Sequence, residues 1–302
     1  MIIATVDIGS NATRVVLVKG EPLDSKNRQN LILKKRFALR LGTDVFQIGH
    51  ISNEKVQQIM MVFKEIKNYF YQYKVSKYKI IATSAFRDAK NHKQVVAEIM
   101  EKFQLKVDVI DGKEEARIIS SSLLRRKLTP TTHSSLLMDI GGGSLEVSIV
   151  NDDKIDFVTS LNVGTLRLIE DIGSGQLKKN YYDQLDKIDD IFITCPPPKK
   201  KSIILGTGGN FRRIGRIRKL LLGLPEEDLI LKNDIPMLIG MIMDLDPEHF
   251  MKAFQMKEEN VPVILPALLM IQRILHFWPA DAILIPKISL NHGLVDELIG
   301  QK

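Results

Sequence analysis

The sequence predicts an α/β protein built from two similar domains. Strand and helix patterns alternate along its 302 residues, a length at which two domains are the usual expectation. An apolar strand that ends in aspartate and enters a glycine-rich turn occurs twice, at Asp7 and at Asp139. When these aspartates are aligned, the strands that follow also match, with Val15 on Val147. Such a repeat indicates a duplicated domain. We expect a first domain over residues 1–125, joined by the last helix at about 290–302, and a second over 126–290.

The elements expected in the first domain follow from hydrophobic periodicity. Strands at Ile2–Ile8 and Thr13–Lys19 flank the first turn. Residues 51–71 carry an apolar stripe at helical spacing that begins near Ser52, a residue type that caps helix N-termini. The remaining expected elements are a strand at Lys79–Thr83, a helix around 95–103, a strand at Lys106–Ile110 and a helix from Lys113 to about Arg126.

The second domain is expected to follow a linker at 127–134, which is rich in Thr and Ser. Its expected strands are Ser135–Ile140, Glu146–Val150, Ile155–Thr159, Ser202–Leu205 and Ala282–Ile285. Residues 165–192 read as largely helical, 195–201 as a loop, and the chain after 205 as mostly helical up to a last helix ending near Ile299.

Composition excludes several classes of protein. With 44% hydrophobic and 26% charged residues, the chain is not disordered, and its single cysteine, Cys195, excludes an internal disulfide framework. The N-terminus lacks the basic region of a signal peptide, and the longest apolar runs are about half of what a bilayer requires. We therefore expect a cytoplasmic protein with no membrane partner. Its net charge of +7 favours polyanionic ligands.

The two repeated turns are candidate phosphate sites. Turns of glycine and small polar residues can direct several backbone N–H groups at one anion. The aspartates before them suit a hard cation such as Mg²⁺. Two ordinary hairpin turns are the alternative interpretation. The candidate phosphate-binding residues are Gly9, Ser10, Asn11, Gly141, Gly142, Gly143 and Ser144.

A third glycine turn, Gly206-Thr207-Gly208-Gly209, lies between an expected strand and helix. Backbone amides at a helix start favour phosphate oxygens. Five cations occur within the eight residues 212–219, and Arg212, Arg216 and Lys219 would share one helix face. A solvated basic surface is the alternative, which we favour for Lys199–Lys201. The weaker polyanion-binding candidates are Arg14, Arg212, Arg213 and Arg216.

Two further features could contribute to a site. Glu114 and Glu115 open the helix that precedes the second domain, and a carboxylate beside a phosphate site can act as general base on water. Helix capping is the alternative. Arg87 follows an expected buried strand, where it could contact phosphate or pair with a surface acid.

Together these segments resemble the exopolyphosphatase and guanosine pentaphosphate phosphohydrolase (Ppx/GppA) family. They occur in the family's order and cover most of residues 1–215. The matching segments are Val6–Asn11, Leu39–Gly42, Ala82–Asn91, Asp111–Arg117, Asp139–Glu146 and Gly206–Gly209.

The resemblance implies the two-domain fold of actin, hexokinase and the heat-shock chaperone ATPases, with an active site in the cleft between domains. It implies Mg²⁺-dependent hydrolysis of the terminal phosphoryl group of inorganic polyphosphate or guanosine pentaphosphate. Glu115 would be the general base, and Asp139 and Glu146 would hold Mg²⁺ and position water, with Asp7 on the opposite wall. Arg87 and the three glycine turns would bind phosphates. The length matches the family's short form.

The chain departs from the family pattern near its C-terminus. Val295 replaces an arginine, Asn260 stands where arginine is common, Ala267 where glycine is common, and Asn210 where threonine is usual. These departures concern substrate length and nucleotide recognition. They leave open a sensor that binds polyphosphate or an alarmone without turnover, and, less favoured, a kinase of the same superfamily.

Other partners are weakly indicated. Sequence-specific nucleic-acid binding is disfavoured because few aromatic residues accompany the basic ones. A homodimer is left open, as is the preference between polyphosphate and guanosine pentaphosphate.

Overall fold

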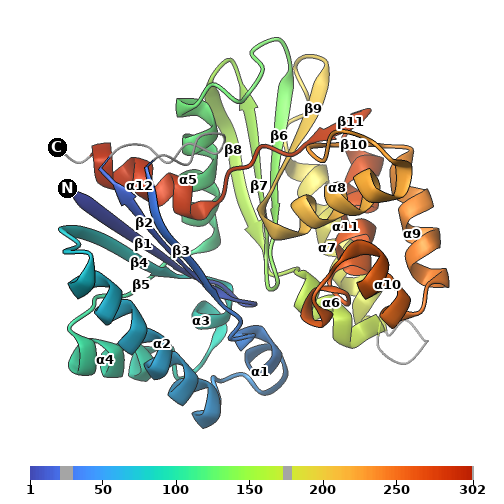
Figure 1. Ribbon diagram of the computed structural model, residues 1–302. Helices are drawn as coiled ribbons and strands as arrows, with labels where there is room; N and C mark the ends of the chain where they lie inside the picture. The colour runs from blue at the N-terminus through green and yellow to red at the C-terminus, as the bar shows by residue number, and fades with distance from the viewer. Residues whose placement is uncertain (21–29, 173–178, 301–302) are drawn as a thin grey trace. The chain divides into compact units, whose positions relative to one another are not determined.

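The computed structural model describes residues 1–20, 30–172 and 179–300. The chain divides into two compact units, which comprise Met1–Ser122 with Ile288–Lys302, and Leu123–Lys287. We call them unit 1 and unit 2. Each contains one mixed sheet with helices packed on it (Figure 1). The predicted class of two similar α/β units is therefore confirmed, while the cleft between them stays a prediction.

Within its described residues, unit 1 contains five strands, the helices α1 to α5 and the helix α12. The strands are β1 (Ile2–Ile8), β2 (Thr13–Lys19), β3 (Leu31–Phe37), β4 (Lys77–Ala82) and β5 (Asp108–Val109). The helices are α1 (Leu41–Ile48), α2 (Asn53–Gln72), α3 (Ser84–Asp88), α4 (His92–Phe103), α5 (Gly112–Arg125), whose last turn belongs to unit 2, and α12 (Leu290–Gly300).

The sheet of unit 1 has the order β3-β2-β1-β4-β5. β1 is antiparallel to β2 and parallel to β4, and β2 is antiparallel to β3. Alternate residues of β1 point to opposite faces. Val6 and its neighbours on one face pack against α2 and α4, whereas Ile3, Val16 and Val18 on the other face pack against Val295 and Leu298 of α12 (Figure 1).

Unit 2 contains six strands and the remaining helices of the described chain. The strands are β6 (Ser134–Ile140), β7 (Leu145–Asn151), β8 (Lys154–Leu161), β9 (Ser202–Thr207), β10 (Leu229–Leu231) and β11 (Ala282–Leu284). The helices are α6 (Thr165–Ile172), α7 (Lys179–Thr194), α8 (Gly208–Leu222), α9 (Asp234–Asp244), α10 (Pro247–Phe254), the 3₁₀ turn Glu258–Asn260 and α11 (Ile264–Phe277).

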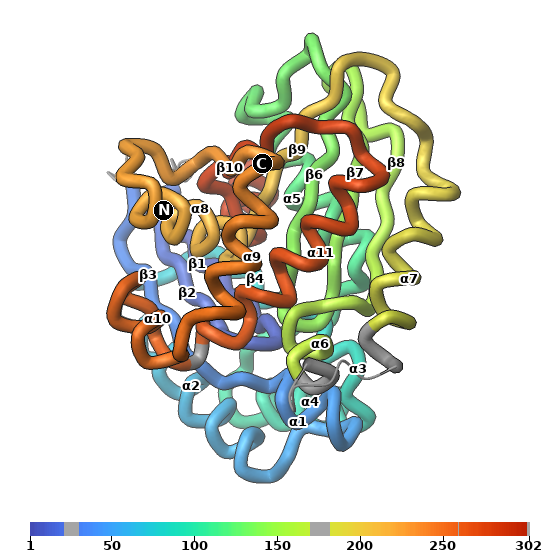
Figure 2. The backbone as a smooth tube through the Cα atoms, turned by 90° about the vertical axis from the view of Figure 1, so that its right-hand side faces the viewer, coloured from blue at the N-terminus to red at the C-terminus, as the bar shows by residue number. Residues whose placement is uncertain are grey.

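The sheet of unit 2 repeats the arrangement of unit 1. Its order is β10-β11-β9-β6-β7-β8, in which β6 is antiparallel to β7 and parallel to β9, as β1 is to β2 and β4. The strongly apolar helix α11 runs beside α7 and α9 in both views (Figures 1 and 2). Its residues Ala267 and Ile271 are completely buried. The duplication predicted from the repeated turns is therefore present in the topology.

Most predicted elements are confirmed to within a few residues, and the first hairpin matches at both ends. Ser52 caps α2, because its hydroxyl accepts the N–H of Lys55. The expected strand at 106–110 is only Asp108–Val109, since just two of its residues pair with β4. The expected helix at 165–192 is two helices, and residues 173–178 between them lie outside the described residues.

Four elements were not predicted, namely β3, β10, α1 and α3. Among the residues that the structure describes, β3 pairs only with β2. It exposes Lys34, Lys35 and Arg36, so it lacks the apolar alternation of a half-buried strand. β10 and α3 are too short to show a period. These elements form because neighbouring strands and turns offer them partners.

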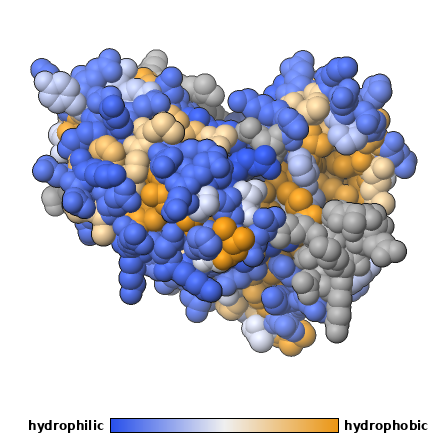
Figure 3. Space-filling view, turned by 90° about the horizontal axis from the view of Figure 1, so that it is seen from below, coloured by the Kyte–Doolittle hydropathy of each residue, from blue (hydrophilic) through white to orange (hydrophobic). Residues whose placement is uncertain are grey.

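No helix within the described ranges is long and apolar enough to span a membrane. The face in Figure 3 is mostly hydrophilic, and its hydrophobic side chains lie in several groups among the polar ones. Such scattered exposure is ordinary for a protein surface.

Candidate functional site

The first glycine turn is a compact reversal between β1 and β2. The N–H of Gly9 donates to the carbonyl of Ala12 at 3.2 Å. The N–H groups of Arg40 and Gly42 donate to the carbonyls of Asn11 and Ser10, at 3.0 and 2.8 Å. These bonds occupy carbonyls of the turn, and they explain why the segment 39–42 accompanies it. The turn is thereby fastened to the start of α1.

Asp7 and Arg14 form an ion pair at the base of this turn. They are directly opposite in the β1–β2 register, and the Arg14 guanidinium donates to Asp7 Oδ2 at 3.1 Å. The carboxylate is only 8% exposed, whereas the arginine side chain is 30% exposed. Burial raises the pKa of Asp7, and Arg14 acts against that shift. Arg14 is thus both the partner of Asp7 and accessible to an anion.

Buried polar atoms surround the first turn without a hydrogen-bond partner among the described residues. They are Asn11 Oδ1, Thr13 Oγ1 and Ser84 Oγ. Ser84 is brought there by β4, because the N–H of Thr83 donates to the carbonyl of Ile8 at 3.1 Å. Buried polar groups are normally satisfied, so such a group calls for a water, ion or ligand. This first turn therefore fits a site that binds a polar ligand.

The second glycine turn repeats two of the backbone hydrogen bonds of the first. The N–H of Gly141 donates to the carbonyl of Ser144 at 2.9 Å, as Gly9 does to Ala12. The N–H of Leu166 donates to the carbonyl of Gly142 at 2.8 Å, fastening the turn to α6. A Cβ on Gly164 would lie 2.5 Å from the Gly142 carbonyl oxygen, so this close approach requires glycine.

A row of polar side chains crosses the sheet of unit 2 at the base of this turn. We call it the Asp139 row; in strand order it contains Thr207, Asp139, Glu146 and Ser160. Asp139 and Glu146 are paired directly across β6 and β7. The Thr207 hydroxyl donates to Asp139 Oδ2 at 3.1 Å, and the Ser160 hydroxyl donates to Glu146 Oε1 at 2.9 Å. Two carboxylates held side by side favour a cation.

The third glycine turn brings the N-terminus of α8 against Asp139. Gly208 has φ +87°, and a Cβ there would lie 2.3 Å from Asp139 Oδ1. Asn210, which stands where the family usually has threonine, donates from its side-chain amide to the carbonyl of Ile140 at 2.8 Å. The first amides of α8 have no acceptor within the helix and favour an anion. Hence the N-terminus of α8 adjoins the paired carboxylates.

The basic residues of α8 do not form one surface. Arg218, one of the five cations counted in the sequence, is buried and paired with Asp234. Arg213 donates to Asn210 Oδ1 at 3.2 Å, near the third turn, whereas Arg216 donates to Gln255 at 2.8 Å. Arg212 is half-buried. Arg218 is therefore not available to a surface anion, and its charge supports the fold of unit 2.

The first turn of α5 carries the candidate base. Asp111 caps the helix, because its Oδ1 accepts the N–H of Glu114 at 2.8 Å. Glu114 forms a bidentate pair with Arg117 at 2.6 and 2.7 Å, which lowers the pKa of Glu114. Glu115 is half-buried, and its Oε2 atom is inaccessible to solvent. The two adjacent glutamates thus have different environments, although the sequence does not distinguish them.

Arg87 lies at the end of α3, close to the start of α5. Its guanidinium donates to the carbonyl of Ile110 at 3.0 Å, and the N–H of Ile110 donates to the carbonyl of Ala82. Arg87 is half-buried. It therefore joins the segment after β4 to the loop that leads to Glu115, a connection that no sequence spacing indicated.

Magnesium fits the donors of unit 2. No group of three or more His, Cys, Asp or Glu that could hold a metal is present among the residues that the structure describes. Magnesium, however, commonly takes one or two carboxylates and completes its shell with water and phosphate oxygens. Asp139 and Glu146 supply such a pair, held by Thr207 and Ser160.

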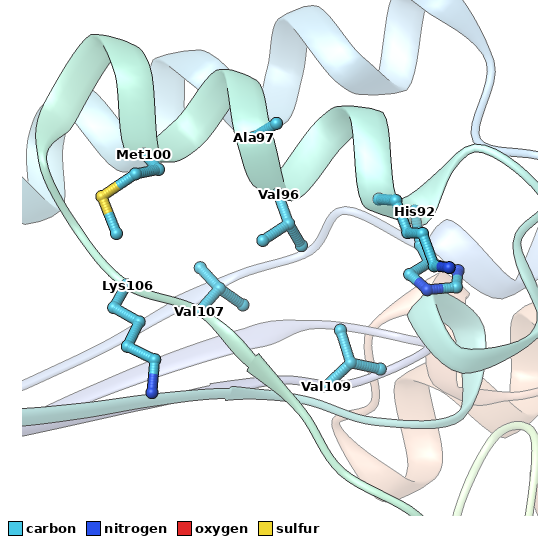
Figure 4. A pocket seen from close by; sticks show the side chains of 8 residues that line it. His92, Val96, Ala97, Met100, Lys106, Val107 and Val109 are labelled. Atoms are coloured by element: carbon cyan, nitrogen blue, oxygen red, sulfur yellow. The ribbon is translucent and has the colours of Figure 1, made fainter.

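A groove on unit 1 contains none of the predicted site residues (Figure 4). It lies between α4 and the strand β5. Apolar side chains such as Val96, Met100 and Val107 line most of it, with Lys93 and Lys106 among them. The candidate site is consequently defined by the turns and not by this groove.

Several contacts of the site were missed from the sequence. Ser160 and Arg167 are far in the chain from the residues they hold, Glu146 and the carbonyl of Gly143. Arg40, a residue of the Leu39–Gly42 motif, has a left-handed backbone with φ 53° and starts α1 at the turn. Strand register brings Ser160 to Glu146, and the packing of α6 and α1 against the turns brings Arg167 and Arg40 there.

The chain is thus a protein of two α/β units, each with a glycine-rich turn beside acidic residues. The Ppx/GppA phosphatase family matches residues 23–302. The chain belongs to the Ppx/GppA phosphatase family.

Three relatives illustrate the likeness. The crystal structure of an exopolyphosphatase from Cytophaga hutchinsonii is 21% identical, with a TM-score of 0.83 over 99% of this chain and 98% of that one. Exopolyphosphatase 1 of Mycobacterium tuberculosis is 22% identical over 98% of this chain and 87% of its own length. A bifunctional 3-dehydroquinate synthase/phosphatase of Fusobacterium nucleatum is 27% identical over 60% of this chain, and the match spans only 28% of that larger protein.

Proposed function

We propose that this protein hydrolyses the terminal phosphoryl group of a linear phosphate chain, either inorganic polyphosphate or guanosine pentaphosphate. The observation that carries the proposal is the duplicated aspartate hairpin within a chain of the Ppx/GppA phosphatase family. Substrate and leaving group are both densely anionic. Catalysis of such a transfer consists mainly of positioning and charge neutralisation.

The proposed binding residues are the backbone amides of the three turns and Arg87. The turns are rigid, because their carbonyls are bonded to α1 and α6 and because glycine is required where Gly208 and Gly164 approach their neighbours. Rigid amides bind phosphate oxygens without reorganisation. Asn11 and Ser84 add polar atoms at the first turn.

Asp139 and Glu146 are the proposed ligands of Mg²⁺, with Asp7 as a further acidic residue. When bound, Mg²⁺ neutralises charge on the phosphoryl oxygens. The chain's own contribution is the fixed orientation of both carboxylates, through Thr207 on Asp139 and Ser160 on Glu146.

Glu115 is the proposed general base. It would accept a proton from water as the water oxygen bonds to the terminal phosphorus and the bridging P–O bond breaks. The shortened phosphate chain leaves with the electrons of that bond. The environments of the two glutamates support this choice, because Glu114 is engaged by Arg117, which holds it ionised in a salt bridge.

The direct test compares Glu115→Gln with Glu114→Gln. Phosphate release from long-chain polyphosphate, triphosphate and guanosine pentaphosphate would be measured with Mg²⁺ and with EDTA. We expect Glu115→Gln to lose about 10²–10⁴-fold in kcat, the usual contribution of a general base. Glu114→Gln should retain most activity, since exposed ion pairs contribute little.

Equal losses in both variants, with circular dichroism unchanged, would remove Glu115 from the role of base. The same assay separates the alternatives. Tight binding of polyphosphate by the wild-type chain without phosphate release indicates a sensor, for which the departure at Val295 is the supporting observation. Phosphate transfer from ATP to an added acceptor indicates a kinase.

A further inference from the structure

The base of the first turn continues as a row of charged side chains across unit 1. Arg14 is opposite Asp7 on β1 and opposite Arg36 on β3. Residues directly opposite in antiparallel strands place their side chains on the same face of a sheet. We call this set, Asp7, Arg14 and Arg36, the Asp7 row. The irregularity in the β2–β3 pairing lies at Leu17 and Val18, away from this row.

The Asp7 row is the counterpart of the Asp139 row, but its charge is opposite. In both units the row runs from the central strand through the hairpin partner to the third strand. In unit 2 the three positions are Asp139, Glu146 and Ser160, and in unit 1 they are Asp7, Arg14 and Arg36. The duplicated fold therefore presents two carboxylates in unit 2, whereas in unit 1 it presents one carboxylate and two guanidinium groups.

The row is placed where an extended anion could reach it. The Arg14 guanidinium is beside the turn, since a Cβ on Gly9 would lie 3.8 Å from its NH1 atom. α12 packs on Ile3, Val16 and Val18, towards the other end of the same face. Arg36 is exposed, and so is Lys34, two residues earlier on the same face.

Arg14 and Arg36 bring two guanidinium groups to neighbouring positions on this face, beside the first turn. Guanidinium groups bind phosphate oxygens in bidentate geometry. We propose that Arg14 and Arg36 form a subsite for phosphoryl groups beyond those held in the first turn, which makes Arg36 a residue that determines preference for longer phosphate chains. The inference rests on the proposed function for its substrate class, although binding can be measured without turnover.

The neighbouring residue provides a matched control. Lys35 has the same charge, lies on the same exposed strand and is opposite Val15, so its side chain is on the other face of the sheet. The residues on either side of it along that face, Leu33 and Phe37, pack against the main core of unit 1. Basic residues on an edge strand also protect against aggregation, and Lys35 shares that role with Arg36.

The experiment measures equilibrium binding of long-chain polyphosphate, triphosphate and orthophosphate to the full chain in EDTA, for wild type, Arg36→Gln, Arg36→Lys and Lys35→Gln. We expect Arg36→Gln to raise the Kd for long-chain polyphosphate about tenfold, the loss of one charge-assisted contact. Orthophosphate binding should be unchanged, Lys35→Gln should differ from wild type by less than about twofold, and Arg36→Lys should restore part of the affinity.

Equal effects of Arg36→Gln and Lys35→Gln, or an equal loss for orthophosphate, overturn the subsite. If the subsite is overturned but wild type still releases phosphate, the proposed hydrolase function is retained without the Arg36 subsite. If wild type binds polyphosphate, Arg36→Gln weakens that binding selectively and no phosphate is released with Mg²⁺, the subsite is supported and the hydrolase is overturned. Thermal unfolding of both variants shows whether the fold is retained, as their exposure predicts.

Discussion

Gly208→Ala tests whether the third turn holds Asp139 as the structure describes. Gly208 starts α8 with φ +87°, a backbone conformation that side chains disfavour. The added Cβ would lie 2.3 Å from Asp139 Oδ1 and 3.1 Å from its Cγ. The carboxylate must therefore move, and its hydrogen bond from Thr207 at 3.1 Å is lost or lengthened.

The size of the effect follows from two contributions. A non-glycine residue at such a φ costs about 1–2 kcal/mol. Losing a hydrogen bond to a charged group costs about 1.5–3 kcal/mol. We expect Gly208→Ala to lower the free energy of unfolding by about 2–4 kcal/mol, allowing for partial relaxation of the carboxylate.

Gly223→Ala is the matched control at the other end of α8. Gly223 has φ +62°, and a Cβ there meets no atom within 4 Å. This variant isolates the backbone cost, about 1 kcal/mol. Urea unfolding followed by circular dichroism gives both values, and phosphate release gives the effect on activity. Equal destabilisation by the two variants, with activity retained in Gly208→Ala, would refute the contact with Asp139.

Two further predictions concern the buried residues of unit 1. Val295→Arg restores the residue usual in the family and should destabilise the chain by about 3–5 kcal/mol. The reason is that the charge would enter the apolar cluster with Ile3, Val16 and Leu298. An unchanged urea midpoint would contradict this packing. Because burial raises the pKa of Asp7, folding takes up a proton between the ordinary value, about 4, and the raised one. The contribution of Asp7 protonation to the free energy of unfolding is fully present below this pH window and is lost as pH rises through it. The free energy of unfolding, measured by urea titration, should therefore decline less in Asp7→Asn than in wild type as pH rises above about 4. If the difference in unfolding free energy between the two proteins is the same at every pH, Asp7 has no raised pKa.

The structure also accounts for one departure from the family pattern. Val295 is fully buried between α12 and the β1–β2 hairpin. Replacing an arginine by valine at this position therefore exchanges a charge for core packing. Glu297, two residues on, pairs with Lys79 at 2.7 Å and with Arg117 at 2.9 Å, so these ion pairs join α12 to both β4 and α5.

The elements that the sequence predicted well are those whose signal is local. The hairpin at Asp7, the helix capped by Ser52 and the second glycine turn each follow from periodicity or from residues that a turn requires. β3 could not be predicted in this way, because Lys34, Lys35 and Arg36 resemble a solvated loop until β2 supplies a pairing edge.

Local sequence pattern alone determined that this chain folds as two α/β units with matching acidic hairpins, because strand periodicity and glycine turns depend on residues that are close together in the chain. Which side chains meet was decided only by tertiary structure. Thr207 donates a hydrogen bond to Asp139, Arg14 lies between Asp7 and Arg36 in the strand register, and Arg218 is buried in an ion pair with Asp234. The physical reason is that strand register sets which side chains of paired strands are opposite one another, and helix packing sets contacts such as that of Arg218 with Asp234; local periodicity encodes neither choice.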